Sequence, residues 1–130
     1  MNEYFSKDSF LTGAIAVEEV KGMQNKGAIP TVKYFAFNEE ANRNRIGIWM
    51  NEQTASLIYL KPYEMVMRPS KGNIHAIMSS FNRTWTLWTS ASNALIINIA
   101  RGECGFDGYV LTDMASSNWQ TYMVYDDYIF

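Results

Sequence analysis

The sequence predicts an α/β fold, because short strand-like segments alternate with longer helical ones. Residues 28–37, 74–81 and 109–113 are short and rich in apolar, β-branched or aromatic side chains. They lack a clean apolar/polar alternation, which is typical of strands covered on both faces. Strands separated by helices of this length indicate parallel pairing through right-handed crossovers.

The first helix is expected over residues 10–27. Leu11, Ile15 and Met23 recur at roughly helical spacing along this segment. Gly27 then provides a suitable C-terminal stop, because glycine tolerates the left-handed backbone that ends many helices. The first predicted strand, 28–37, follows directly.

A second helix is expected after the polar loop 38–45. It begins near Asn51 or Thr54 and carries Ile58 among its apolar residues. Pro62 falls inside it and lacks a backbone N–H, so the helix must kink or break there unless a local rearrangement absorbs the lost hydrogen bond.

The remaining elements complete the alternation. Residues 68–73 form a turn before the second strand, and 82–92 are predicted to be a loop. A third helix is expected over 92–105, ending at a glycine, and a turn over 105–108 leads into the third strand. Three strands make a small sheet with two open edges, so the sheet is expected to be incomplete by itself.

Composition excludes several classes of protein. The 130 residues suit one modest domain, and the net charge of −2 gives no reason to expect nucleic acid or an anionic membrane as a partner. A single cysteine excludes an intrachain disulfide and a cysteine metal cluster, and no metal or cofactor is expected. Without a signal-peptide pattern or a membrane-span pattern, the sequence predicts a cytoplasmic location. The nineteen aromatic residues suit either a core or sugar binding.

Candidate functional residues lie at the carboxyl ends of the predicted strands, where parallel α/β folds gather their sites. Lys33 and Tyr34 are near the end of the first strand, and residues 78–81 end the second. Asp113 ends the apolar run YVLTD, where a carboxylate is costly to bury unless it is paired or used. The alternative is that Asp113 caps a following helix.

Four strings carry a resemblance to a known family, and they occur in the family's order and spacing. FSKDSFLTG, TVKYFAFNEE, AIMSSFNR and GFDGYVLTDMASS together resemble glycoside hydrolase family 3. The resemblance covers nearly the whole chain. It implies a partial TIM (β/α)8 barrel, an internal piece of the catalytic barrel that corresponds to its fifth to seventh strands over residues 1–130.

The resemblance also implies an activity, which is that of a retaining β-glucosidase-like glycoside hydrolase. The family's nucleophile ends the strand after GF-x-G and corresponds to Asp113, which would form a covalent glycosyl-enzyme. The family's acid/base residue usually comes from a downstream domain that this chain lacks. The isolated chain is therefore expected to have little activity, and the alternative is a non-catalytic partial barrel that binds sugar weakly or self-associates through its open edges.

The family's sugar contacts transfer to five positions of this chain. Lys33 and Tyr34 match a Lys-His pair that binds sugar hydroxyls, so Tyr34 replaces the histidine. Met78 and Phe81 match a methionine and a tyrosine near the reacting sugar, so Phe81 lacks a hydroxyl. Arg43 matches a loop arginine that could contact substrate, in a loop that is one residue shorter than usual. The implied partner is a β-glucoside-like carbohydrate.

Other residues are better explained by structure than by chemistry. His75 starts a strand, at the end opposite to catalysis, and Cys104 is interpreted as a small buried hydrophobe. The pair Glu39–Glu40 is interpreted as exposed loop, with substrate contact as the alternative. Trp85 and Trp88 lie in the loop after the second strand, where sugar stacking competes with a core role.

Overall fold

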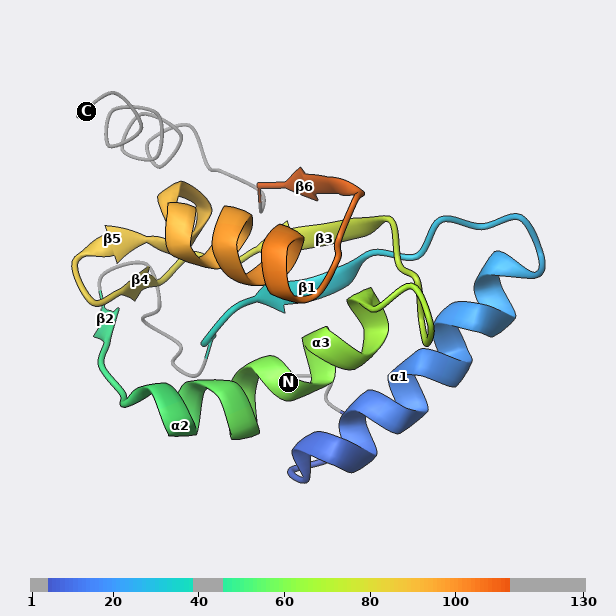
Figure 1. Ribbon diagram of the computed structural model, residues 1–130, viewed down its shortest axis with the longest axis horizontal. Helices are drawn as coiled ribbons and strands as arrows, with labels where there is room; N and C mark the ends of the chain where they lie inside the picture. Colours follow the sequence, from blue (N-terminus) through green and yellow to red (C-terminus); the bar gives the residue numbers. More distant parts are fainter. Residues whose placement is uncertain (1–4, 39–45, 113–130) are drawn as a thin grey trace.

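The computed structural model describes residues 5–38 and 46–112 (Figure 1). The elements in chain order are α1 (Ser9–Gln24), β1 (Val32–Phe35), β2 (Gly47–Ile48), α2 (Glu52–Thr54), the π-helix η2 (Ala55–Leu60), α3 (Lys61–Met67), β3 (Ala76–Ser79), β4 (Arg83–Thr84), β5 (Leu87–Trp88), the 3₁₀-helix η3 (Thr89–Ala91), the π-helix η4 (Ala94–Glu103) and β6 (Tyr109–Leu111).

The main sheet contains the three predicted strands in the order β1-β3-β6. Both pairings are parallel, so the predicted α/β fold with three parallel strands is confirmed. Ile77 of the central strand pairs with Val32 on one side and with Val110 on the other. Because the strands are parallel, their carboxyl ends meet at one edge of the sheet.

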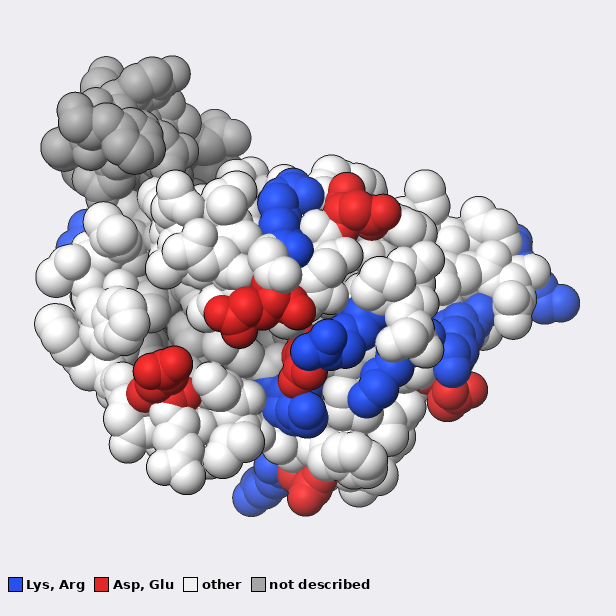
Figure 2. All heavy atoms as spheres, viewed as in Figure 1, with Lys and Arg blue, Asp and Glu red and all other residues white. Residues whose placement is uncertain are grey.

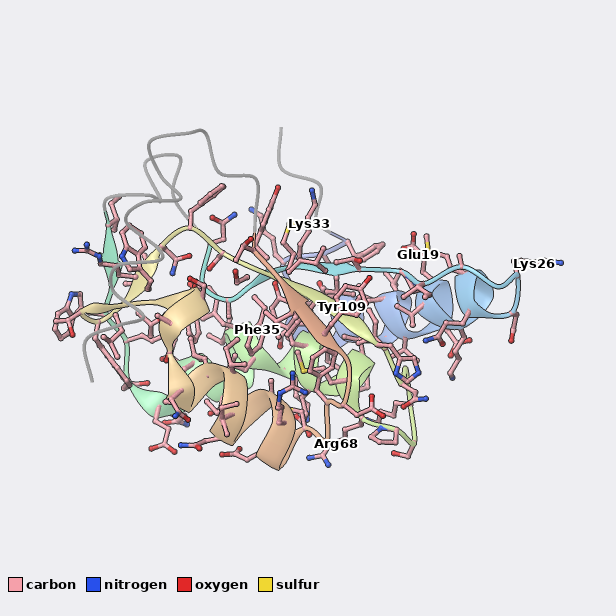
Figure 3. The ribbon with its side chains drawn as sticks, turned by 90° about the horizontal axis from the view of Figure 1, so that it is seen from above. Glu19, Lys26, Lys33, Phe35, Arg68 and Tyr109 are labelled. Carbon is pink, nitrogen blue, oxygen red and sulfur yellow. The ribbon has the colours of Figure 1, made fainter. Side chains whose placement is uncertain are left out.

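The two faces of this sheet differ in what covers them. Phe35 and Ile77 belong to the buried core that the helices share, and Val110 packs against it. Lys33 lies on the other face: Figure 3 shows its side chain pointing away from the side on which η4 and Arg68 lie. Only β3 is largely buried, whereas β1 and β6 expose Lys33 and Tyr109. The expectation that every strand is covered on both faces was therefore wrong for the edge strands.

Helix α1 begins one residue before the predicted start and ends three residues before the predicted end. Asp8 caps it, because its Oδ1 accepts a hydrogen bond of 2.7 Å from the backbone N–H of Leu11. Gly27 has a φ of +79°, the left-handed conformation expected just beyond a helix. Val17 and Val20 are buried on the face that packs against α3.

The second predicted helix continues past Pro62 through a change of helical type. Asn51 caps α2 by accepting a hydrogen bond of 2.8 Å from the N–H of Thr54. The π-helical turns of η2 follow, and Pro62 falls in the first turn of α3, where a backbone N–H has no helical partner to lose. The expected local rearrangement is thus the π-helical segment, whose wider turns shift the hydrogen-bond register.

A small second sheet was missed by the sequence analysis. β4 and β5 form an antiparallel hairpin inside the predicted loop 82–92, and β4 also pairs in parallel with β2. Each strand has two residues, which is too short for a periodic pattern. The third predicted helix is present as η4, over 94–103 and in π-helical form.

One hydrophobic core joins the helices to the main sheet. Phe35 and Ile77 from the strands meet Val66 of α3, Leu95 of η4 and Val17 of α1. Arg101 ties the end of η4 to the turn before β6, because its guanidinium donates to the carbonyl oxygens of Phe106 at 3.4 Å and Gly108 at 3.1 Å. The end of η4 therefore helps to fix the position at which β6 begins.

Helix length and surface charge are two general features of the described part of the chain. No helix over 5–38 or 46–112 is long and apolar enough to cross a bilayer. On the face shown in Figure 2, lysine and arginine side chains are interspersed with aspartate and glutamate side chains over α1 and α3. Oppositely charged neighbours cancel one another's field over that face.

Candidate active site

The predicted site residues that are described lie in, or just after, neighbouring parallel strands of the main sheet. Lys33 and Tyr34 are in β1, Met78 is in β3, and Phe81 follows β3 by two residues. Met78 pairs with Leu111 of β6, and Thr112 is the last described residue before Asp113. Parallel pairing therefore brings Tyr34, Met78 and Phe81 toward the carboxyl ends of adjacent strands, with Lys33 one residue earlier in β1.

Two of the predicted residues, Asp113 and Arg43, lie outside the described residues, and so does the pair Glu39–Glu40. Their assignments remain predictions. What is described is the strand that leads to Asp113. This strand, β6, lies beside β3 and ends at Leu111, two residues before Asp113.

Lys33 is exposed, and its ammonium lies 4.8 Å from the centre of the Tyr34 ring. That distance is within the range of a cation–π contact, which is weak at an exposed position. Over 5–38 and 46–112 no carboxylate forms a salt bridge with Lys33. A lysine held loosely over its neighbour's ring remains able to donate to a hydroxyl oxygen.

Tyr34 is fixed through its backbone by a helix. The hydroxyl of Tyr63, in α3, donates to the carbonyl oxygen of Tyr34 at 2.5 Å. The Tyr63 ring also meets the ring of Phe35 edge-on, with centroids 5.1 Å apart. Tyr63 therefore braces the end of β1 from the helix side, a role that sequence reasoning missed because the two residues are far apart in the chain.

The aromatic residues of the hairpin have unequal access. Trp88 is 5% exposed, and the guanidinium carbon of Arg83 lies 4.4 Å from its ring centre. Burial removes Trp88 from the candidates for sugar stacking. Trp85 is 51% exposed and has a φ of +55°, so its ring is accessible. Phe81 is 9% exposed and belongs to the buried aromatic residues.

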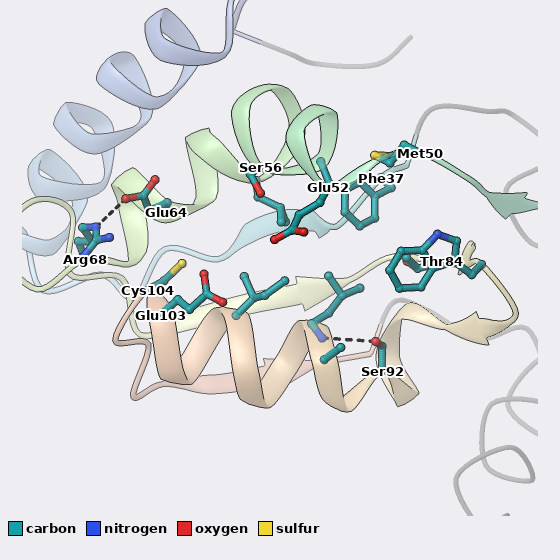
Figure 4. A pocket seen from close by; sticks show the side chains of 16 residues that line it. Phe37, Met50, Glu52, Ser56, Glu64, Arg68, Thr84, Ser92, Glu103 and Cys104 are labelled. Atoms are coloured by element: carbon teal, nitrogen blue, oxygen red, sulfur yellow. Dashed lines mark hydrogen bonds and ion pairs between the residues drawn. The ribbon is translucent and has the colours of Figure 1, made fainter.

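A groove of about 470 Å³ lies on the helix side of the main sheet, between η2–α3 and η4 (Figure 4). Phe37, Leu60 and Leu95 line it with apolar surface, and Glu52 and Glu103 line it with carboxylates. Lys33, Tyr34, Met78 and Phe81 do not line this groove. The groove is therefore separate from the edge at which the predicted sugar contacts gather.

Cys104 is buried and His75 lies at the amino end of the strands, as the sequence analysis predicted. Cys104 is 5% exposed, and this burial raises the pKa of its thiol to about 11. His75 directly precedes β3, at the amino end of the strands, and its Nδ1 lies 3.0 Å from Asp107 Oδ1. Within the described part of the chain, no three histidine, cysteine or acidic side chains form a group that could hold a metal ion.

Comparison with known proteins gives the family. The family model described as "Glycosyl hydrolase family 3 N terminal domain" matches residues 1–125. A β-glucosidase of Ruminococcus albus is 40% identical over 112 residues, which are 85% of this chain and 12% of that protein. An exo-α-(1→6)-L-arabinopyranosidase of Bifidobacterium longum is 32% identical over 117 residues, 89% of this chain and 15% of that protein.

Solved structures agree in fold. β-Glucosidase 3B of Thermotoga neapolitana in complex with glucose superposes with a TM-score of 0.81 at 32% identity, covering 85% of this chain and 15% of that one. A Kluyveromyces marxianus β-glucosidase in complex with glucose also gives a TM-score of 0.81, at 34% identity, over 85% of this chain and 13% of that one. The chain thus spans roughly an eighth to a seventh of the length of these relatives. The family match, the parallel sheet and the superpositions together show that this chain belongs to glycosyl hydrolase family 3, within its N-terminal domain.

Proposed function

We propose that this chain supplies part of the active site of a retaining, β-glucosidase-like glycoside hydrolase. The observation that carries the proposal is the shared edge of the main sheet. Tyr34 on β1 and Met78 on β3 lie in the carboxyl halves of their strands, Lys33 directly precedes Tyr34, and the carboxyl end of β6 leads to Asp113. In parallel α/β barrels, this is the side at which catalytic residues gather. In the same proposal, β1, β3 and β6 are the fifth to seventh strands of the barrel.

The proposed reaction proceeds in two displacements. The carboxylate of Asp113 attacks the anomeric carbon while the bond to the leaving-group oxygen breaks, and an acid protonates that oxygen. Water then attacks the glycosyl-enzyme ester, releases the sugar with retained configuration and returns the Asp113 carboxylate. We assign no residue of this chain as the acid, so unactivated glycosides are expected to react slowly with the chain alone.

The sugar contacts follow from donor and acceptor chemistry. The Lys33 ammonium donates to sugar hydroxyl oxygens, and the Tyr34 hydroxyl can both donate and accept. Met78, which is half-buried, supplies apolar surface beside the sugar ring, Phe81 can add only the 9% of its surface that is exposed, and Arg43 is proposed as a further donor. The substrate class is a β-glucoside. Because one relative is named as an α-L-arabinopyranosidase, a pyranose of similar size is the first competitor to test.

The deciding experiment is hydrolysis of an aryl β-glucoside whose leaving group needs little protonation, with an aryl α-L-arabinopyranoside in parallel. Turnover that disappears in Asp113→Ala supports the proposal. Mass spectrometry of the chain after reaction with an activated 2-deoxy-2-fluoroglucoside should show one added glycosyl group on the peptide that contains Asp113. Turnover that survives in Asp113→Ala contradicts the assignment of the nucleophile.

The second candidate function is assembly, and one observation favours it. β1 and β6 each have a sheet partner on one side only within the described residues. Such edges can pair with another chain. Light scattering across a concentration series tests this alternative. A mass that stays at the 14.9 kDa of one chain at every concentration argues against it.

A further inference from the structure

Two buried hydroxyl groups join three segments at the carboxyl edge of the main sheet. Ser80 and Thr89 are both 0% exposed. Ser80 Oγ donates to the carbonyl oxygen of Ala36 at 2.7 Å, and Thr89 Oγ1 donates to the carbonyl oxygen of Ser80 at 2.6 Å. The two hydroxyl oxygens are 3.0 Å apart. We call this pair the Ser80–Thr89 clasp.

Backbone hydrogen bonds complete the clasp. The N–H of Ser80 donates to the carbonyl oxygen of Phe35 at 3.0 Å, and the N–H of Thr89 donates to that of Asn82 at 3.2 Å. The clasp therefore connects the end of β1, the end of β3 and the start of η3. Regular pairing between β1 and β3 stops at Phe35 and Ser79, so the clasp continues their association beyond the ladder.

The clasp lies immediately beside the proposed sugar contacts in the chain. Phe35 directly follows Tyr34, and Ser80 directly precedes Phe81. The hydrogen bond between the N–H of Ser80 and the carbonyl oxygen of Phe35 fixes how far apart the ends of β1 and β3 lie. The backbone turns sharply just beyond, since Phe37 has a φ of +68°. That conformation is rare for a residue with a bulky side chain and needs support from its surroundings.

We infer that Thr89, acting through Ser80, is a positioning residue that holds the Tyr34 and Phe81 sides of the sugar site in register. The inference rests on the proposed function. Neither clasp residue contacts the sugar, because both are fully buried. Each hydroxyl has one O–H group, which donates a hydrogen bond to a carbonyl oxygen of another segment. Removal of either hydroxyl therefore leaves a buried carbonyl without its donor.

The test compares variants of Thr89 by ¹⁵N NMR of the chain. Thr89→Val removes the hydroxyl and keeps the shape, whereas Thr89→Ser keeps the hydroxyl. The chain offers a matched control in Thr84, which is 7% exposed and whose hydroxyl has no hydrogen-bond partner among the described residues. Thr84→Val is the same chemical change in the neighbouring hairpin without a donated bond to lose.

The expected result has two parts. In Thr89→Val, amide resonances of residues 33–37 and 78–82 move, while Thr89→Ser and Thr84→Val leave them at the parent positions. Titration with D-glucose then gives a dissociation constant about tenfold weaker in Thr89→Val than in the parent chain, as expected when a site loses about one well-made hydrogen bond.

Three outcomes overturn the inference. The first is a folded Thr89→Val whose strand-end resonances and glucose affinity match the parent. The second is Thr89→Ser perturbing the same amides, since it loses only a methyl group; this outcome is decisive even if Thr89→Val does not fold. The third is a parent chain without glucose-induced shifts, which contradicts sugar binding by the chain. This failure of sugar binding can be told apart from a failure of the clasp, because the amide resonances of the variants without glucose still report on the clasp.

Discussion

Replacement of Gly108 by alanine should weaken the pairing of β6 with β3. A Cβ at Gly108 lies 2.1 Å from the carbonyl oxygen of His75 and 2.6 Å from its Cα. These are backbone atoms, so no side-chain rotation relieves the overlap. The N–H of Tyr109 donates to the same carbonyl at 3.1 Å, at the start of the β3–β6 ladder. The strand must move away or lose this bond.

The expected cost combines two effects. Forcing an extra carbon into packed structure costs typically 1–3 kcal/mol, and one lost backbone hydrogen bond costs about 1 kcal/mol. We therefore expect Gly108→Ala to lower the free energy of unfolding by about 3 kcal/mol. Urea unfolding followed by far-UV circular dichroism measures this difference from the midpoint and slope.

Gly22 provides the matched control. It lies inside α1, and a Cβ there meets nothing within 4 Å. Gly22→Ala should raise the free energy of unfolding by roughly 0.8 kcal/mol, because alanine is the better helix former. A Gly108→Ala chain as stable as the parent would refute the close approach of the two backbones on which the reasoning depends.

Three further predictions concern single side chains. The pKa of the Cys104 thiol is raised to about 11 by burial, so iodoacetamide at pH 8 should alkylate the folded chain roughly a hundredfold more slowly than the urea-unfolded chain, by mass spectrometry; equal rates would show an accessible thiol. The hydrogen bond from Lys61 lowers the pKa of Glu64, so the stability it contributes is present above the unfolded value of about 4.3 and lost as the pH falls through the folded pKa. Glu64→Gln should therefore be less stable than the parent at pH 7, by under about 1 kcal/mol, and equal to it near pH 3 in urea unfolding; a difference that stays constant with pH would contradict this. Tyr63→Phe removes the hydroxyl that donates to the carbonyl of Tyr34 and should cost about 1 kcal/mol in the same urea assay, whereas an unchanged midpoint would contradict the brace.

Much of the fold follows from local patterns in the sequence. The three strands of the main sheet, their parallel direction and the three helical segments were predicted from alternation and spacing. Asn51 and Gly27 acted at helix ends as their chemistry predicts. The hairpin of β4 and β5 escaped because two-residue strands carry no period, and nothing local distinguishes a π-helix from an α-helix in η4.

The place of the proposed site was also predicted from the sequence, because the carboxyl ends of parallel strands lie at the same end of a sheet. The sequence analysis assigned Lys33, Tyr34 and Met78 to that end, and the structure shows them in the adjacent strands β1 and β3, whereas their contacts with sugar stay predictions. The family was predicted from four motifs that occur in the family's order, and the family model that matches residues 1–125 confirmed it. The roles of Asp113 and Arg43 stay predictions that depend on the resemblance.

Only the tertiary structure decided which distant residues support that edge. Trp85 and Trp88 look alike in sequence, yet one is exposed and the other buried under Arg83. Thr89 became a positioning candidate because folding brings its hydroxyl to the carbonyl of Ser80, nine residues away. The sequence by itself determined the elements and their chemistry, since propensity and spacing are local properties. Burial and long-range hydrogen bonds depend on where each element packs, and packing is settled by the whole chain at once.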